Sequence, residues 1–177
     1  MKVSIRLCKF NFNQLQGANV KATLQEFKTI TDEQHNIINY KCVFIINDIK
    51  IAEVPILLFN VNTDGEIYGL NNRCALLLAQ MGLFTEQEQD GIKTGQIDID
   101  TDDIKKYIGK SVECKLDISS FENDKKETIS FVWLYPIKPN EQATSILLRI
   151  AQAKQNSKID AMDNLDDTYD INDRYNI

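Results

Sequence analysis

Short runs of alternating apolar and polar residues, each closed by a turn signal, limit what this chain can fold into. In one such run Val20, Ala22 and Leu24 fall on one side, and Lys21 and Thr23 fall on the other. A period of two residues is typical of a strand with one buried face. We expect further strands over residues 2–12, 39–47, 49–61, 110–121 and 127–135. The chain is therefore predicted to be mainly β.

A helix is predicted to interrupt these strands at Leu70–Met81, where apolar residues recur at spacings of three and four. Asn71 or Asn72 is expected to cap its first turn, and Gly82 is expected to end it. A helix placed between the third and fourth strands is typical of the oligonucleotide-binding barrel, a partly open five-stranded barrel. We therefore expect an oligonucleotide-binding-like barrel with one internal helix.

Three regions are expected along the 177 residues. Residues 1–139 form the barrel domain, residues 140–156 form a C-terminal helix capped by Asn140, and residues 157–177 form an acidic, flexible tail. The apolar stripe of the C-terminal helix is expected to pack on the barrel or against a second subunit. The sequence leaves open whether the chain forms a homo-oligomer.

The tail carries six aspartates against Lys158 and Arg174, and it contains no glycine or proline. A segment of this composition cannot bury enough apolar surface to fold, so we expect it to be disordered and to act in autoinhibition or partner recruitment. The first fifty residues have the opposite balance, with seven Lys or Arg and four Asp or Glu. The candidate partner-binding residues of the tail are Asp166, Asp167, Asp170, Asp173 and Tyr175.

Several kinds of chemistry are not supported by the residues. The one histidine, His35, lies in a polar loop without a nucleophile signature nearby. No phosphate-binding glycine loop occurs, and no cofactor or metal is expected. The four cysteines are far apart and are expected to be reduced, mostly buried thiols of a cytoplasmic protein: Cys8, Cys42, Cys74 and Cys114. The chain is expected not to be an enzyme.

The acidic run Asp98–Asp103 resembles the start of a calcium-binding loop. Its first three oxygen ligands match, but Asp103 stands where the loop needs glycine and Gly109 stands where it needs a bidentate glutamate. We expect instead that Thr101 or Asp102 caps a short helical turn. A metal-dependent nuclease built on these acids is the weakest alternative.

Single-stranded nucleic acid requires cations along its phosphates and aromatic rings under its bases. Both occur on neighbouring expected strands and on the last hairpin, whereas Phe44 and Trp133 are expected in the core. The candidate nucleic-acid-binding residues are Lys21, Phe27, Lys28, Tyr40, Lys41, Lys110, Lys115 and Tyr135.

Three short segments of the sequence are similar to segments of known proteins. They are the helix region from Gly69 to Gly82, the stretch Ile108-Gly-Lys-Ser-Val-Glu-Cys-Lys115, and the hairpin end Trp133-Leu-Tyr-Pro136. Together they resemble small single-stranded-DNA-binding-like proteins encoded by phages or mobile elements. The resemblance implies an oligonucleotide-binding fold, sequence-independent binding of single-stranded DNA in the bacterial host cytoplasm, and replication or recombination proteins as partners.

The sequence therefore favours one function and leaves one main alternative. The first is a non-catalytic single-stranded-DNA-binding protein whose acidic tail competes for the basic surface or recruits partners. The alternative is an acidic interaction protein that mimics DNA and inhibits a host nucleic-acid enzyme.

Overall fold

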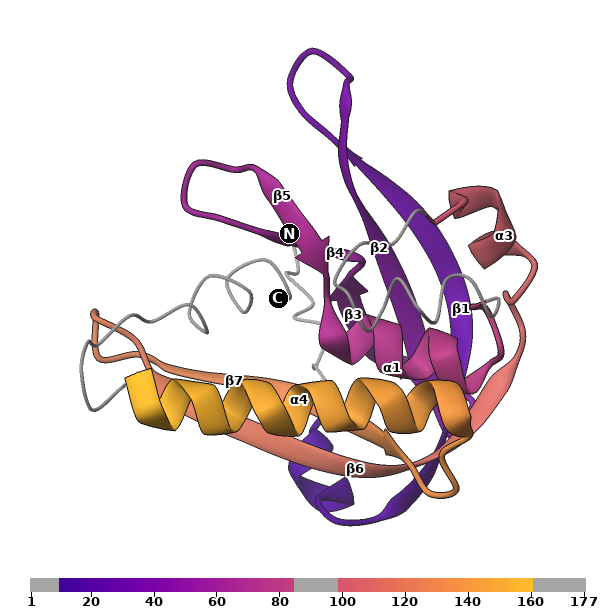
Figure 1. Cartoon of the computed structure of the whole chain (residues 1–177). Coiled ribbons are helices and arrows are strands. Elements are labelled where there is room, and N and C mark those ends of the chain that lie inside the picture. Colours follow the sequence, from indigo (N-terminus) through magenta and orange to yellow (C-terminus); the bar gives the residue numbers. More distant parts are fainter. Residues whose placement is uncertain (1–9, 85–98, 161–177) are drawn as a thin grey trace, which may run out of the picture.

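The computed structural model describes residues 10–84 and 99–160, with side chains to residue 156 (Figure 1). The predicted tail residues Asp166, Asp167, Asp170, Asp173 and Tyr175 lie outside this range, as does Cys8. The elements in chain order are η1 (Phe12–Leu15), β1 (Asn19–Thr31), β2 (Ile37–Ile46), β3 (Ile49–Leu57), β4 (Phe59–Val61), β5 (Ile67–Leu70), α1 (Asn72–Gln80), α3 (Thr101–Lys105), β6 (Ser111–Glu122), β7 (Thr128–Pro136) and α4 (Glu141–Asp160).

Five of the described strands form one antiparallel sheet in the order β3-β2-β1-β6-β7, and β4 pairs with β5 as a separate hairpin. The prediction of a mainly β fold with an internal and a C-terminal helix is confirmed. Within the described residues the sheet is open, because β3 and β7 are its two edges.

Two local features shape the first part of the sheet. The β2–β3 turn at Asn47 and Asp48 has both residues in the left-handed region, with φ of 53° and 59°, as a tight hairpin turn requires. The register of β1 against β2 shifts between Leu24 and Glu26, so β1 carries a bulge there. Beyond the bulge the β1–β2 hairpin projects from the body of the molecule (Figure 1).

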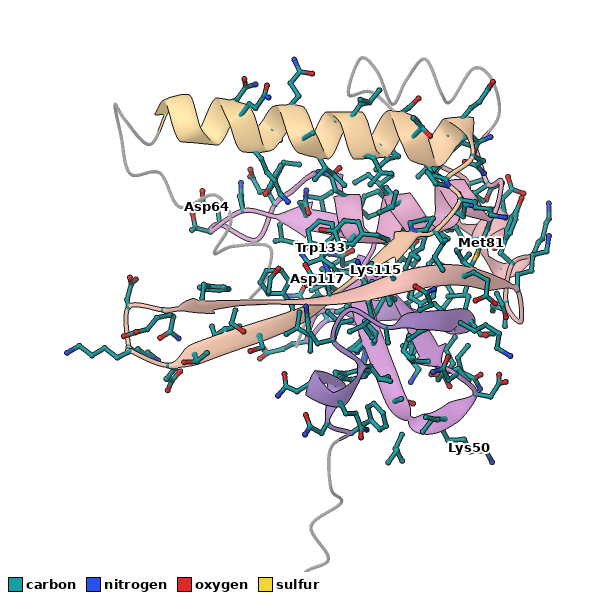
Figure 2. All side chains as sticks on the ribbon, turned by 90° about the horizontal axis from the view of Figure 1, so that it is seen from below. Lys50, Asp64, Met81, Lys115, Asp117 and Trp133 are labelled. Atoms are coloured by element: carbon teal, nitrogen blue, oxygen red, sulfur yellow. The ribbon has the colours of Figure 1, made fainter. Side chains whose placement is uncertain are left out.

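The core lies between the sheet and α1, and α4 covers α1 from the other side (Figure 2). As predicted, Asn71 caps α1 through its side chain, and Gly82 follows its end with φ of 88°. Asn140 caps α4 by accepting from the Ala143 amide at 2.8 Å. The apolar stripe of α4, which includes Ile146 and Ile150, is buried in the same core.

Beyond shifts of one or two residues at the ends of elements, four features differ from the expected ones. The strand expected over residues 49–61 breaks at Leu58 into β3 and β4, because the side-chain amide of Asn39 binds both main-chain groups of Phe59. Residues 2–9 of the expected strand 2–12 lie outside the described residues, and its expected end is not a strand, since Phe12 starts η1 under an Asn11 cap. The strand β5 was not predicted.

The fourth difference is at α4, which runs to Asp160 and so includes the first four residues of the expected tail. No glycine or proline follows the apolar stripe to end the helix at residue 156. None of the helices in the described ranges is both long and apolar enough to cross a membrane.

Candidate nucleic-acid interface

The sheet register assigns five of the eight candidate residues to one face. Val20, Ala22 and Leu24 of β1 point into the core, so the alternating residue Lys21 points outward. Across the strand pairs, Lys21 lies opposite Glu113, and Asn19 lies opposite Lys115. The outer face, as we call it, carries the candidate residues Lys21, Lys28, Lys41, Lys115 and Tyr135.

Lys28 and Lys41 lie directly opposite each other on β1 and β2. Two cations at such a position repel, so a nearby anion is needed to stabilise them. Glu26 fills this role for Lys28, with 2.7 Å between Nζ and Oε2, and the hydrogen bond to Glu26 raises the pKa of Lys28. Glu53 on β3 adds a weaker effect in the same direction. The pair could exchange this carboxylate for a phosphate.

Lys21 is held by the β2–β3 turn. Its Nζ lies 2.5 Å from Oδ2 of Asp48, and its main-chain amide donates to Oδ1 of Asn47 at 2.9 Å. Its charge is thus already offset within the protein. Lys21 is therefore a weaker candidate for phosphate contact than Lys41.

Phe27 and Tyr40 are brought together, but on the core-facing side of the β1–β2 hairpin. Their rings stack with centroids 5.2 Å apart and planes 5° apart, and Tyr40 meets Phe59 edge-on at 6.4 Å. Both residues are half-buried against the core. The two candidate stacking rings therefore lie on the opposite side of the sheet from Lys28 and Lys41, because the bulge in β1 leaves Phe27 beside Cys42 and on its side of the sheet.

The β6–β7 hairpin holds the other part of the outer face. Lys115 lies opposite Tyr135, and the Tyr135 ring stacks on Trp133 with centroids 5.4 Å apart. Burial raises the pKa of Tyr135, and the charge of Asp117 adds to this effect. Trp133 is half-buried rather than fully buried, and it faces the helices, since Arg73 of α1 and Lys154 of α4 lie 5.9 and 6.0 Å from its ring centroid.

Lys110 lies apart from this face, just before β6. Its Nζ lies 4.4 Å from the centroid of the Tyr107 ring, a cation–π contact. His35 has φ of 64° at the exposed β1–β2 turn, where Asp32 accepts from the amides of Gln34 and Asn36. Neither residue is part of a cluster with Lys28 and Lys41.

The described part of the acidic run has structural partners. Asp100, rather than Thr101 or Asp102, caps α3, because its side chain accepts from the Asp102 amide. Asp102 and Asp103 pair with Lys105 and Lys106 at 3.0 and 2.6 Å. In residues 10–84 and 99–156, no three His, Cys, Asp or Glu side chains gather as a metal site.

One residue that the sequence did not single out is Arg73 of α1. It is buried, and its Nε and Nη2 both donate to the carbonyl oxygen of Val132 on β7. Its guanidinium also lies 5.2 Å from the Phe131 ring centroid and 5.9 Å from that of Trp133. The sequence signal that could have identified Arg73 is a single charged residue in the otherwise apolar first turns of a helix, because charged residues are rarely buried without a partner.

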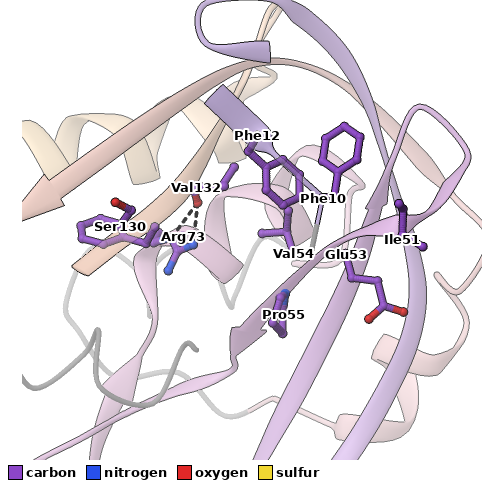
Figure 3. A pocket seen from close by; sticks show the side chains of 10 residues that line it. Phe10, Phe12, Ile51, Glu53, Val54, Pro55, Arg73, Ser130 and Val132 are labelled. Carbon is purple, nitrogen blue, oxygen red and sulfur yellow. Dashed lines mark hydrogen bonds between the residues drawn. The ribbon is translucent and has the colours of Figure 1, made fainter. Parts of the chain in front are cut away.

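Arg73 forms part of a cavity of about 410 Å³ between the two edge strands of the sheet (Figure 3). Residues 53–55 of β3 line one side, and residues 130–132 of β7 line the other. Phe10 and Phe12, in edge-on contact at 4.9 Å, come from the chain before β1. The cavity was not predicted, because it joins segments more than a hundred residues apart.

No protein-family model matches this chain, and no curated protein matches its sequence.

Proposed function

We propose that the chain is a non-catalytic protein that binds single-stranded DNA without sequence preference, in support of phage or mobile-element DNA replication or recombination in the host cytoplasm. The observation that carries the proposal is the outer face, on which Lys28, Lys41 and Lys115 lie with Tyr135. Cations for phosphates, with a half-buried ring beside Lys115, are the groups that a single strand requires.

The strand order supports an oligonucleotide-binding barrel as the scaffold. In β3-β2-β1-β6-β7 the first three strands form a meander, α1 follows it in the chain, and β6 returns to β1. This is the arrangement of a five-stranded, partly open Greek-key barrel, in which the second and third strands and the loops after the first and fourth strands contact the ligand. Here those elements are β2, β3, the β1–β2 turn and the β6–β7 turn.

The acidic tail would compete for the same surface. A tethered polyanion near lysines lowers the affinity for DNA, and salt weakens both interactions. Strand binding would release the tail to recruit replication or recombination proteins, with Asp166, Asp167, Asp170, Asp173 and Tyr175 as the contact residues.

A fluorescence titration with labelled oligo-dT tests the proposal, on the full chain and on a chain ending at Asp160. We expect salt-sensitive binding that tightens when residues 161–177 are removed. A variant with the tail aspartates changed to asparagine should behave like the truncation. No binding by either protein at low salt would refute the proposal and would favour the DNA-mimicking inhibitor.

A further inference from the structure

The two edges of the sheet face each other across the cavity, and each is blocked against strand addition. Leu58 donates its amide to the Tyr40 carbonyl, which makes Leu57 and Lys41 a non-hydrogen-bonded pair. By alternation Pro55 belongs to the same class, so its nitrogen faces the open edge and offers no N–H there. On the other edge the Val132 carbonyl is taken by Arg73.

The gap is therefore better suited to a compact ligand than to a sixth strand. A closing strand needs an unbroken row of donors and acceptors, and both rows are interrupted near their centres. The volume of about 410 Å³ lies within the range of about 300–1,000 Å³ that small-ligand sites occupy.

The walls of the cavity select a flat aromatic ligand with a polar rim. Phe12 and Phe131 line the cavity and offer ring surfaces. The guanidinium of Arg73 lies 5.2 Å from the Phe131 ring centroid and is held by its hydrogen bonds to the Val132 carbonyl (Figure 3). The strand alternation also turns the peptide groups of Glu53 and Ser130 toward the gap. Rings for stacking and main-chain groups for hydrogen bonds are how unstacked bases are held in single-stranded nucleic acid.

The strand register sets the cavity near Lys41. Pro55 lines the cavity and pairs with Val43 on β2, and Lys41 is two residues from Val43 on the same face. Diagonal neighbours of this kind lie about 7–8 Å apart. A phosphate held by Lys41 would leave its own base near the mouth of the cavity.

We propose that one unstacked base of the bound strand enters the cavity between β3 and β7 and stacks on Phe131. This inference rests on the proposed function and adds a specific base site to it. The phosphates stay on the outer face, and only the neutral base reaches the buried end of Arg73.

Amide chemical shifts of the ¹⁵N-labelled full chain separate the two parts of the interface. Oligo-dT should shift residues 53–55 and 130–132 as well as Lys28 and Lys41. An abasic deoxyribose-phosphate oligomer of the same length should shift only the two lysines. If oligo-dT shifts the lysines and leaves the cavity residues unchanged, the base site is refuted and the proposed function stands. If no amide shifts with either oligomer at low salt, even without the tail, both are refuted.

A variant pair gives an independent measure. Phe131→Leu keeps an apolar side chain but removes the ring, and should weaken oligo-dT binding by about 5- to 150-fold, the range for loss of one base–aromatic stack. Phe121→Leu is the control, since Phe121 contacts Phe131 at 6.1 Å but does not line the cavity. Equal affinities of the two variants would overturn the base site. Circular dichroism checks that both variants are folded. If one variant is unfolded, the amide chemical-shift experiment on the unmodified chain decides the question instead.

Discussion

Arg73 donates two hydrogen bonds to the carbonyl oxygen of Val132, from Nε at 3.1 Å and from Nη2 at 2.5 Å. This contact joins the first turn of α1 to the open edge of β7. It also keeps the guanidinium against the Phe131 and Trp133 rings. A helix that follows β5 in the chain is thereby tied to a strand almost sixty residues later.

Replacing Arg73 should destabilise the fold. Arg73→Met keeps a long side chain but leaves the Val132 carbonyl without its donor, which costs about 1–3 kcal/mol of unfolding free energy. Urea denaturation followed by Trp133, the single tryptophan, measures the change. Lys50→Met is the control, since Lys50 is exposed and points away from the body (Figure 2). Equal unfolding free energies of the two variants would show that the contact contributes nothing.

Removing the carboxylate beside Lys28 should strengthen DNA binding. In Glu26→Gln the ammonium group no longer has to leave an ion pair to meet a phosphate, and one repulsive charge is gone. Because exposed ion pairs are weak, we expect oligo-dT affinity to rise by only roughly 1.5- to 5-fold at low salt. Glu141→Gln, in the first turn of α4 and outside the proposed interface, should have little effect. Weaker binding by Glu26→Gln would mean that Lys28 does not contact the strand.

Lys41 should contribute to the salt dependence of oligo-dT binding. For a single strand, the slope of log K against log salt changes by about 0.7 for each phosphate contact. Lys41→Ala should therefore make the slope shallower by about this amount, whereas Lys138→Ala, beyond the end of β7, should leave it unchanged. An unchanged slope in Lys41→Ala removes this lysine from the interface.

Asn140 holds α4 on α1. Its Oδ1 caps α4, and its Nδ2 donates to the carbonyl of Ala79 at 2.9 Å. Asn140→Ala should lower the unfolding free energy by about 0.5–2 kcal/mol through loss of the cap. Thermal unfolding by circular dichroism checks this, with Gln152→Ala on the exposed part of α4 as the control. A variant as stable as this control would contradict the capping role.

Buried thiols should make the protein less stable at high pH. Burial raises the pKa of Cys114 from 9.0 to about 12. The pKa of Cys74 is also raised, and its hydrogen bond to Cys42 is the largest cause. Between these pH values the unfolded chain loses a proton that the folded chain keeps, so the unfolding free energy falls as pH rises.

Denaturation at pH 8 and pH 10 measures this decrease, and Cys114→Ala should reduce it. At pH 8, thiol reagents should leave Cys42, Cys74 and Cys114 unmodified until the protein is unfolded, because all three are free and buried. Rapid labelling of Cys114 in the folded protein would contradict the burial that raises its pKa.

Much of the fold could be predicted from local patterns. The alternation of Val20, Ala22 and Leu24 predicted β1, and the apolar spacing after Leu70 predicted α1 with its Asn71 cap. These elements depend on residues close together in the chain, so their patterns survive in the sequence. Pro55 lies in β3, an edge strand, where the missing N–H of a proline breaks no ladder hydrogen bond.

The candidate site was predictable only in part. Lys28 and Lys41 were chosen for charge near rings, and they do lie opposite each other. Phe27 was chosen with them, but a bulge between Leu24 and Glu26 changes which residues of β1 share a face. A bulge of one residue leaves no clear trace in an apolar pattern.

The sequence by itself determined the five strands of the main sheet, the two main helices, their caps and the uneven distribution of charge, because each depends on neighbouring residues. Only the tertiary structure decided which lysines share the outer face, that Phe27 and Tyr40 stack on each other, and that Arg73 meets β7. These contacts depend on strand order and register, which bring together groups far apart in the chain. The cavity between β3 and β7 is the clearest case, since Phe10, Pro55, Arg73 and Phe131 come from four separate segments.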